Sequence, residues 1–449
     1  MRSRYKSVLN RTFPIAAGLL EVLLLAVVYY LAWDSYRMII NPALFHFRGK
    51  LILMLVYAAI AYVVFKVCDS FNFSNLKLSD IIVSQCISIL IVNMITYLQI
   101  CLIGNGMVTV IPMVLLSLID FVICFCWSFV CKKICHGFSR IDNALLIYGT
   151  EAALSLKDKM DHRLELYNVT ECISAADGFE RITEAIGGHE AVIINDVPAE
   201  LRNDILKYCF SRNVLIYMVP KITDIIMKGT SHVSSFDTPL VKVRNEGLFP
   251  YEVFIKRAAD ILLSFLALVV LSPLMLMIAF AVKVSDGGPV FYRQKRLTIG
   301  NREFDILKFR SMVPNAEKAT GAVRAEEDDP RITKVGRFLR TCRLDELPQL
   351  INIFLGDMSI VGPRPERPEL TAQLMETTPE FAYRTKVKGG LTGYAQVYGK
   401  YKTSSYDKLK LDLIYIENYS LLLDVKLMLM TPQILFRKES SEGVGKDEV

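Results

Sequence analysis

The chain has 449 residues, of which 52% are hydrophobic and 22% charged, and its mean hydropathy is +0.34. It is too apolar for an ordinary soluble enzyme and too charged for a pure transporter, so a mixed protein is expected. If a membrane part takes the first third, about 300 residues remain, which is enough for two water-facing domains. The net charge of +6 is modest and no basic arm is present, so we expect no nucleic-acid partner.

The ten cysteines do not suggest a disulfide framework. Seven lie at or before Cys135, in or beside apolar segments, and the remaining three are Cys172, Cys209 and Cys342. This distribution indicates reduced thiols. A cluster near the end of the apolar region consists of Cys124, Cys126, Cys131, Cys135 and His136. Its spacing matches no paired zinc motif, so we interpret these cysteines as packing residues.

Four apolar stretches predict a four-helix transmembrane bundle over residues 1–135. They are Phe13–Trp33, Leu51–Phe65, Ile81–Ile103 and Met107–Cys131. No charged residue separates the last two, so the turn between them must be Gly104-Asn105-Gly106. The basic start precedes a long apolar run without a cleavage pattern, which predicts an uncleaved anchor.

Basic residues at the two ends of the bundle predict its orientation. Those before the first span are Arg2, Arg4, Lys6 and Arg11, and those after the fourth are Lys132, Lys133 and Arg140. Both ends are therefore placed in the cytoplasm. The inner loops give a weaker and opposite bias, with three basic residues in 34–50 and two in 66–80.

Two carboxylates lie within the predicted spans, Glu21 and Asp120. An ionisable group inside a membrane is a functional candidate. Because no ordered series of charges suggests an ion path, we favour carboxylates that face the bundle and pair with another span.

Residues 140–248 predict a Rossmann-like α/β domain, because short apolar runs alternate with helical stretches. The expected strands are 144–148, 163–167, 191–195 and 214–219, and the clearest helices are 151–160 and 199–210. The turn after the first strand has one of the three fingerprint glycines, Gly149, and Glu151 puts a carboxylate where a pyrophosphate would lie. We therefore expect a regulatory or interaction domain rather than a dinucleotide site.

A fifth apolar stretch, from Ile261 to Val282, contains no charged residue. Basic residues flank it on both sides: Lys256, Arg257, Lys283, Arg293, Lys295 and Arg296. Ser272-Pro273 falls at its midpoint, where proline kinks a helix and Ser272 can satisfy the freed carbonyl. We predict a re-entrant helix, whose arms would each reach roughly 16 Å, about half the hydrocarbon core. A straight fifth span, which would export everything after Val284, is the alternative.

Residues 285–449 must carry any chemistry on carboxylates, cations and a metal. They contain no histidine, no nucleophile-elbow serine, no Walker lysine loop and no paired cysteines. Asp345 and Glu346 are expected at a helix edge, with Pro348 opening a short helix that ends before Gly356. Adjacent side chains face differently, so one carboxylate can attack a phosphorus while the other holds a metal or orients a group.

Three cations are suited to phosphate oxygens: Lys308, Arg340 and Arg364. Taken alone, this pattern also fits a solvated polar helix edge. A set of motifs in order changes that balance: Ser272-Pro273, 291–296 (FYRQKR), 307–312 (LKFRSM), 340–349, 356–359 (GDMS), 362–365 (GPRP), 390–396 (GLTGYAQ) and 411–420. Over residues 250–437 the chain resembles the bacterial polyprenyl-phosphate sugar-1-phosphate transferases, the monotopic phosphoglycosyl transferases. Four spans followed by a Rossmann-like domain are similar to the large branch, which primes capsule, exopolysaccharide and O-antigen synthesis.

The resemblance implies transfer of a sugar-1-phosphate from a UDP-sugar to undecaprenyl phosphate, with release of UMP, a Mg²⁺ cofactor and a covalent intermediate. It implies that Asp345 is the nucleophile, that Glu346 assists with metal or proton handling, and that both lie at the metal. It further implies phosphate binding by Lys308, Arg340 and Arg364, and a nucleotide pocket at Pro363, Arg364 and Pro365. The implied catalytic domain is mainly helical (α+β), and residues 438–449 form a polar tail.

The same resemblance implies a multi-pass protein of the bacterial inner membrane whose catalytic domain faces the cytoplasm and supplies downstream glycosyltransferases. It leaves a homo-oligomer and the identity of the sugar open. Two positions depart from the family pattern: Arg343 replaces a small hydroxyl residue and Gly389 replaces a proline. Two other functions stay as alternatives, an inactive membrane scaffold for polysaccharide assembly and an NAD-linked nucleotide-sugar enzyme.

Overall fold

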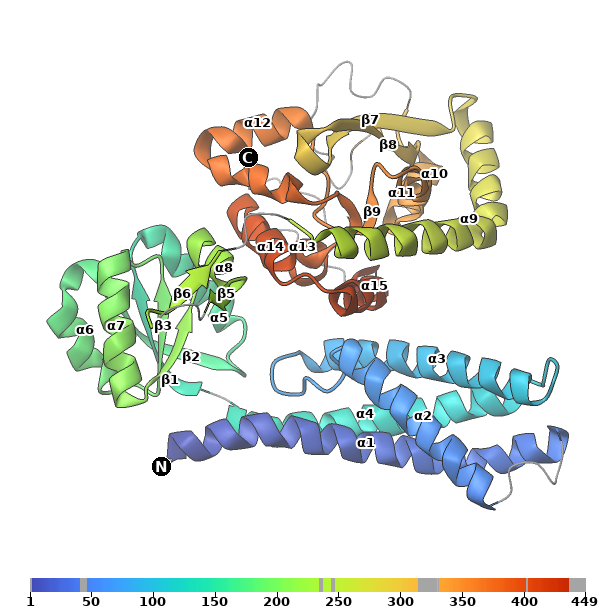
Figure 1. Ribbon diagram of the computed structural model, residues 1–449, viewed down its shortest axis with the longest axis horizontal. Helices are drawn as coiled ribbons and strands as arrows, with labels where there is room; N and C mark the ends of the chain where they lie inside the picture. Colours follow the sequence, from blue (N-terminus) through green and yellow to red (C-terminus); the bar gives the residue numbers. More distant parts are fainter. Residues whose placement is uncertain are drawn as a thin grey trace. The chain divides into compact units, whose positions relative to one another are not determined.

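The computed structural model describes residues 2–40, 47–139, 141–233, 237–243, 247–313, 329, 331–400 and 403–435. It forms two compact units, residues 1–221 and 222–449 (Figure 1). The predicted polar tail, 438–449, and Arg140 of the predicted basic flank lie outside the described residues.

Four long helices form the first part of the chain. They are α1 (Arg2–Ile40), α2 (Phe47–Val67), α3 (Leu78–Ile103) and α4 (Ile111–Ser139). The predicted turn is confirmed, because α3 ends on Gly104 and Asn105 follows with φ of 51°. Within the described residues, these four helices and α9 (Pro250–Asp286) are long and apolar enough to cross a membrane. The chain therefore has the helices of a membrane protein.

The interior of this bundle contains two groups of polar side chains. Glu21 is buried and accepts a hydrogen bond from Gln85 of α3, with 2.8 Å between Oε1 and Nε2. Asp120 is buried and accepts hydrogen bonds from Asn93 at 3.0 Å and from the Tyr57 hydroxyl at 3.3 Å. The prediction that both carboxylates face the bundle and bond to other helices is confirmed.

The cysteines of α4 divide between the core and the surface. Cys124, Cys131 and Cys135 are buried, which confirms their interpretation as packing residues, whereas Cys126 is exposed. Cys131 and Cys135 pack with Ala17 and Ile81. The described cysteines are all free thiols.

The rest of the first unit is a parallel sheet with the order β2-β1-β3-β4. The strands are β1 (Ile141–Tyr148), β2 (Tyr167–Ser174), β3 (Ala191–Asn195) and β4 (Leu215–Met218). The helices and 3-10 turns between them are η1 (Glu151–Leu154), α5 (Ser155–Asp161), η2 (Ala175–Asp177), α6 (Phe179–Ile186) and α7 (Ala199–Arg212). The predicted Rossmann-like sheet is confirmed at this coarse level.

The second predicted strand was wrong in position. Residues 163–166 form a turn, closed by a 2.8 Å bond from Leu166 N to Arg163 O, and the strand begins only at Tyr167. This strand lies at the edge of the sheet and mixes polar with apolar residues, unlike the central β1 and β3. An apolar run is therefore a poor signal for it.

The turn after β1 closes against the loop after β3. A Cβ built on Gly149 would lie 1.9 Å from the Asp196 carbonyl oxygen, so only glycine fits this approach. Thr150 donates a hydrogen bond to the Asp196 carboxylate at 2.9 Å. Two carboxylates, those of Asp196 and Glu151, thus stand beside the turn, and their charge disfavours a pyrophosphate there.

The second unit is mainly helical. Its helices are α8 (Ile222–Lys228), α9, α10 (Lys334–Thr341), α11 (Gln349–Leu355), α12 (Pro368–Thr377), α13 (Tyr394–Tyr398), α14 (Ser405–Glu417) and α15 (Leu421–Leu435). Its 3-10 turns are η3 (Ile299–Asn301), η4 (Leu344–Glu346) and η5 (Pro379–Lys386). The predicted short helix after Pro348 is α11, which ends before Gly356 as expected.

Three pairs of short strands complete this unit. β5 (Ser231–Val233) and β6 (Leu240–Lys242) are antiparallel, as are β7 (Phe291–Leu297) and β8 (Glu303–Phe309), whereas β9 (Ser359–Val361) and β10 (Gly390–Thr392) are parallel. The helices and strands agree with the expected α+β composition. α8 packs on α14 through Ile222 and Ile225 and so belongs to this unit, although its residues lie within the predicted 140–248 domain.

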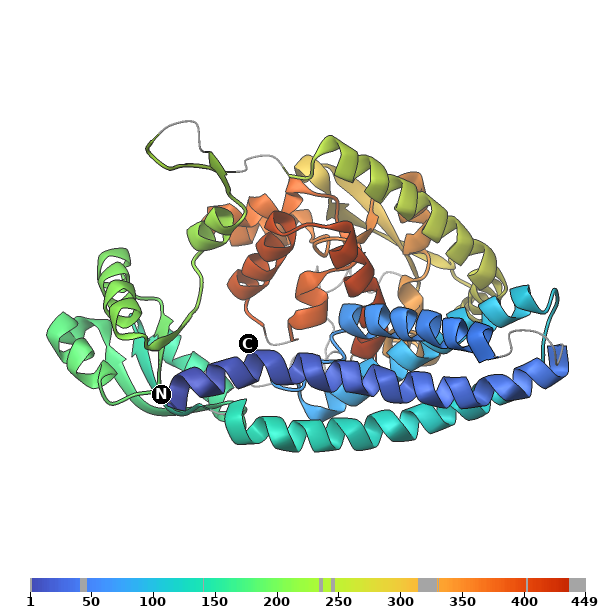
Figure 2. The same cartoon turned by 60° about the horizontal axis from the view of Figure 1, so that its bottom comes forward.

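α9 is bent near its middle, as Figures 1 and 2 show. Pro273 cannot donate to the carbonyl of Val269, and the Ser272 hydroxyl donates to that carbonyl instead, at 2.8 Å. The predicted kink and its serine partner are therefore observed. We call residues 250–271 the first arm and residues 274–286 the second arm.

Candidate active site

The predicted catalytic segment lies in the bend of α9. The leucines on either side of Asp345 and Glu346 belong to a cluster with the second arm, which contains Leu344, Leu347, Leu274, Ile278, Val282, Phe309 and Leu339. α11, which follows directly, packs on the first arm in a cluster that contains Leu350, Ile353, Ala267, Leu268, Leu271, Phe304 and Ile306. One bent helix thus supports the carboxylates from both sides.

Asp345 is a buried carboxylate with unused acceptor capacity. It lies in the 3-10 turn η4, directly after Arg343, whose φ of 56° is left-handed. Its side chain is 8% exposed, and Oδ1 is buried without a hydrogen-bond partner among the described residues. Burial raises the pKa of Asp345, and the positive charge of Lys308 opposes that rise. A buried acceptor of this kind is a candidate for contact with a ligand.

Glu346 has the opposite environment. Its Oε1 accepts a hydrogen bond from Arg364 Nη2 at 2.7 Å and another from Lys308 Nζ at 3.1 Å. Burial alone would raise the pKa of Glu346, but the charges of Arg364 and Lys308 outweigh burial and hold this pKa well below its usual range. Burial lowers the pKa of Lys308, an effect that Glu346 opposes. Glu346 is therefore a fixed negative charge between two cations.

The structure brings the predicted phosphate-binding cations to these carboxylates. Lys308 extends from β8 and Arg364 follows β9, and both bond to Glu346. Arg340, in the last turn of α10, keeps a buried Nη1 without a partner among the described residues, and its charge lowers the pKa of Asp345. Asp345, Glu346, Lys308 and Arg364 therefore lie together, and the charge of Arg340 acts on Asp345.

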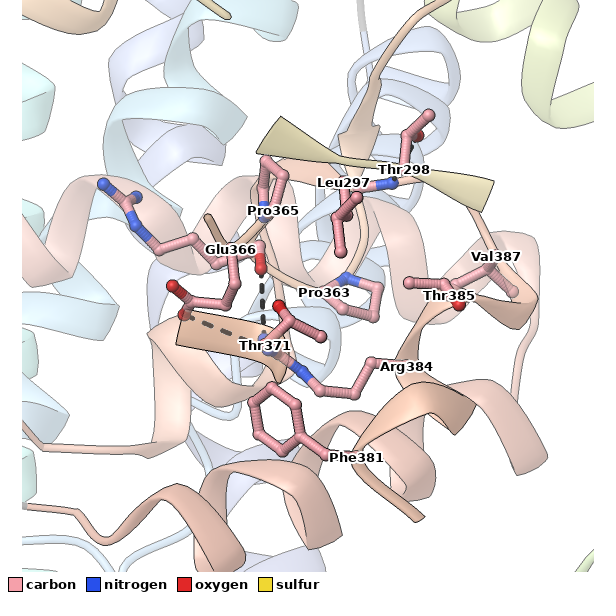
Figure 3. Close-up of a pocket in the computed structure, with 12 residues that line it drawn as sticks. Leu297, Thr298, Pro363, Pro365, Glu366, Thr371, Phe381, Arg384, Thr385 and Val387 are labelled. Atoms are coloured by element: carbon pink, nitrogen blue, oxygen red, sulfur yellow. Dashed lines mark hydrogen bonds and ion pairs between the residues drawn. The ribbon is translucent and has the colours of Figure 1, made fainter. Parts of the chain in front are cut away.

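The Pro363-Arg364-Pro365 loop lines a small cavity, shown in Figure 3. Arg384 supports the loop by donating to the Arg364 carbonyl at 3.1 Å and to the buried Asp412 carboxylate at 2.6 Å. The cavity measures about 20 Å³, room for about one water molecule. This cavity is too small for a nucleobase. It does not by itself account for the predicted nucleotide pocket at this loop, which stays a prediction.

Sequence reasoning missed the charges that hold this loop. Arg296 donates to the Pro365 carbonyl at 3.1 Å and lies 3.7 Å from Glu366, and burial lowers the pKa of Arg296 to about 10. Arg296 was interpreted as part of the basic flank of α9, although it also ends the FYRQKR motif, which was the available signal. For Arg384 and Asp412, 28 residues apart, the sequence gives no sign of pairing.

The two carboxylates differ in the oxygens that they could offer to Mg²⁺, an ion that is usually bound by one or two carboxylates together with substrate phosphates. Oδ1 of Asp345 is unpartnered, whereas Oε1 of Glu346 is already bonded to two cations. No group of three or more His, Cys, Asp or Glu in the described part of the chain could hold a metal unaided. Of the two carboxylates, Asp345 therefore has the oxygen that is free to meet a cation.

The sequence of the chain matches a known protein family. The bacterial sugar transferase family matches residues 251–438, from the start of α9 to beyond α15. The exopolysaccharide production protein ExoY of Sinorhizobium fredii is 40% identical over 190 residues, which are 39% of this chain and 83% of that protein. The chain belongs to the bacterial sugar transferase family.

Longer relatives of this sugar transferase match over part of their length. The UDP-N-acetylgalactosamine-undecaprenyl-phosphate N-acetylgalactosaminephosphotransferase of Aeromonas hydrophila is 37% identical over 54% of this chain and 59% of its own length. The UDP-glucose:undecaprenyl-phosphate glucose-1-phosphate transferase of Escherichia coli K12 is 41% identical over 46% of this chain and 43% of its own. The chain thus spans about half the length of these curated relatives. Every predicted site residue lies within the family match.

Proposed function

We propose that this sugar transferase moves a sugar-1-phosphate from a UDP-sugar to undecaprenyl phosphate and releases UMP. The observation that carries the proposal is Asp345, a buried carboxylate with an unpartnered oxygen beside three cations. The names of the relatives, which act on undecaprenyl phosphate, support the acceptor and the general reaction. Attack at phosphorus needs an ionised nucleophile and nearby cations to offset the repulsion between anions.

In the first step a carboxylate oxygen of Asp345 attacks the sugar-bearing phosphorus of the donor. A bond forms between that oxygen and phosphorus, and the bond from phosphorus to the bridging oxygen breaks. UMP leaves with the electron pair, so no proton is needed. Lys308, Arg340 and Arg364 are the residues proposed to bind phosphate oxygens during this step.

In the second step an oxygen of undecaprenyl phosphate attacks the same phosphorus. The phosphorus–carboxylate bond breaks, and Asp345 leaves as a carboxylate. Mg²⁺, which Asp345 and Glu346 would hold with substrate phosphates, offsets negative charge when it is bound. Glu346 keeps Lys308 and Arg364 in place at the site.

The membrane arrangement belongs to the same proposal. α1–α4 span the bacterial inner membrane with both ends in the cytoplasm, and α9 enters the bilayer, bends at Ser272-Pro273 and returns. The bend and its Ser272 hydrogen bond support this arrangement. The active site then faces the cytoplasm, where nucleotide sugars are supplied.

A UMP-release assay tests the reaction with purified protein, undecaprenyl phosphate and a panel of UDP-sugars that covers glucose, galactose and their N-acetyl and deoxy relatives. UMP release should require Mg²⁺ and should disappear in Asp345→Asn. Asp357→Asn is the matched control, because Asp357 pairs with the exposed Arg302. Rapid quenching with labelled donor should trap label on Asp345. Confirmed turnover without any such label would exclude the covalent mechanism.

A further inference from the structure

The first arm of α9 makes polar contacts with the part of the unit that holds the active site. Arg257 extends from this arm to the end of α11. Its Nη1 donates to the carbonyl of Ile353 and its Nη2 to that of Phe354, each at 2.7 Å. The last carbonyls of a helix have no partner within the helix, so the guanidinium caps α11. Its two-pronged shape gives each of the two neighbouring carbonyls an N–H donor of its own, in a fixed geometry that the single ammonium of a lysine does not have.

The residue that ends α11 fits this contact. Gly356 has φ of 100°, and a Cβ on it would lie 3.1 Å from Nη2 of Arg257. Glycine therefore suits the left-handed conformation, and it leaves room for the guanidinium, which a Cβ would crowd. Gly356, the first residue of the GDMS motif, thus fits the contact between α11 and α9.

Two further residues of the first arm hold other elements. Lys256 is 7% exposed and forms a 2.6 Å ion pair with Asp424 of α15, which also accepts a hydrogen bond from Tyr415 at 2.7 Å. Asp260 accepts hydrogen bonds from the Ser359 hydroxyl at 3.1 Å and from the Ile360 amide at 2.9 Å, both in β9. Lys256 was predicted as a flanking membrane charge, but this ion pair buries it in the unit.

These contacts fix the active site along α9. α11 begins four residues after Asp345, and β9 ends three residues before Arg364. A shift of the first arm would therefore move both the nucleophile and a phosphate-binding residue relative to the apolar part of the helix.

We propose that Arg257 is a positioning residue that, with Lys256 and Asp260, sets the height of Asp345 relative to the phosphate of the lipid acceptor. This inference rests on the proposed function and deepens it. The donor is soluble in water, so its access to the site does not depend on the height of the site relative to the bilayer. The phosphate of the acceptor is held at the bilayer surface, so reaction with it depends on how the unit is fixed to its membrane helix.

The test compares Arg257→Ala with Lys283→Ala in the full chain in lipid nanodiscs. Both changes remove one basic residue beside the apolar stretch, but within the described part of the chain Lys283 bonds only to the Gly287 and Gly288 carbonyls that follow it. In Arg257→Ala, kcat/KM for undecaprenyl phosphate should fall on the order of 10- to 100-fold, while the amount of labelled donor trapped on Asp345 stays within about twofold. Lys283→Ala should leave both unchanged. Equal losses in the two variants, or equal losses for donor and acceptor in Arg257→Ala, would overturn the proposal.

A second readout does not depend on activity. A spin label on the exposed Cys342, with the other cysteines replaced, reports the depth of the catalytic segment relative to labelled lipids. Arg257→Ala should change this depth and Lys283→Ala should not. Arg257→Lys, which keeps the charge but replaces the two-pronged guanidinium with a single ammonium, should show a smaller loss of acceptor kcat/KM. Wild-type acceptor kinetics and wild-type depth in Arg257→Lys would refute the proposal even if Arg257→Ala does not fold. If wild-type protein traps no label, the proposed function fails, and the depth measurement still decides the position of the segment.

Discussion

Asp345 and Glu346 are neighbours in the chain with opposite electrostatic environments. Burial dominates at Asp345 and raises its pKa, whereas Arg364 and Lys308 outweigh burial at Glu346 and lower its pKa. Pairs of carboxyl groups with pKa values moved apart in this way are typical of sites that give each group its own role. The geometry favours Asp345 as the reacting group, because Glu346 is already bonded to two cations.

The raised pKa of Asp345 predicts the acid side of the pH profile. Asp345 must be ionised to attack, so adduct formation should fall as pH decreases through a pKa above the usual value of about 3.9. Lys308→Met removes a charge that lowers this pKa, so the fall should move to higher pH. Single-turnover labelling across pH measures the pH at which adduct formation falls, independently of the overall rate. A fall that stays in place or moves to lower pH would contradict this assignment.

The Arg384–Asp412 ion pair predicts a large effect on stability. Both side chains are buried, and removing one partner of such a pair costs about 3–5 kcal/mol because the other charge is left without compensation. Arg384→Met should therefore lower the melting temperature of the detergent-solubilised protein clearly. Glu303→Gln breaks the exposed pair with Lys295 and should have little effect. Similar melting temperatures for the two variants would show that the buried pair does not stabilise the unit.

The residues that the sequence could identify are those whose chemistry stands out locally or by resemblance. The sequence predicts Asp345, Glu346 and the three cations as site residues, because the segment lacks other catalytic groups and matches the family motifs. Lys256 and Arg296 were assigned to the membrane flank, because their partners, Asp424 and Pro365, lie 168 and 69 residues away. A basic residue beside an apolar run looks the same in the sequence whether it faces lipid headgroups or a buried carboxylate.

At the scale of elements, the bend of α9 is the feature that organises the site. Proline acts on its own helix, so its effect could be predicted from Ser272-Pro273 alone. What the sequence does not contain is the packing of the catalytic segment on both arms. The bend therefore shapes the active site in addition to any role in membrane topology.

Tags on either side of α9 test the topology. Accessible cysteines placed before Lys256 and after Lys283 should both be labelled from the cytoplasm, because the proposed re-entrant helix returns to the face from which it enters. Pro273→Leu restores the missing backbone donor, so the helix can straighten. In a fraction of the molecules, the second cysteine should then be labelled from the periplasm. A wild-type second site that is labelled from the periplasm would show that α9 is a straight span.

The end of α11 predicts a second effect on an element. Gly356→Ala forces a side chain into a left-handed conformation, which costs about 1–2 kcal/mol, and brings it against Arg257. The variant should be less stable and should lose reaction with the acceptor more than with the donor. Gly188→Ala, where the nearest atom lies at 3.7 Å and φ is not left-handed, is the control. Unchanged stability in Gly356→Ala would contradict the cap.

On the scale of the whole molecule, the chain combines two units with different relations to known proteins. The family match lies entirely in the second unit, and it covers every element from α9 to α15. The match with ExoY covers 83% of that relative. The proposed catalytic site therefore lies in the second unit, and the parallel sheet of the first unit lies outside the family match.

This division predicts the behaviour of a shortened chain. Residues 222–449 should associate with membranes and release UMP from the donor that the full chain uses, because the site and its supports all lie within them. The assay should include Asp345→Asn in the same shortened chain, which should be inactive. A folded but inactive shortened chain would assign the first unit a part in the reaction itself.

The support that α9 gives to the catalytic segment also bears on how such chains diversify. A catalytic module that carries its own scaffold in a single bent helix can be joined to different upstream parts without redesign of its chemistry. Selection on the apolar surface of that helix, however, is not free. Each substitution that suits a new lipid environment must also preserve the packing of α9 against the catalytic segment.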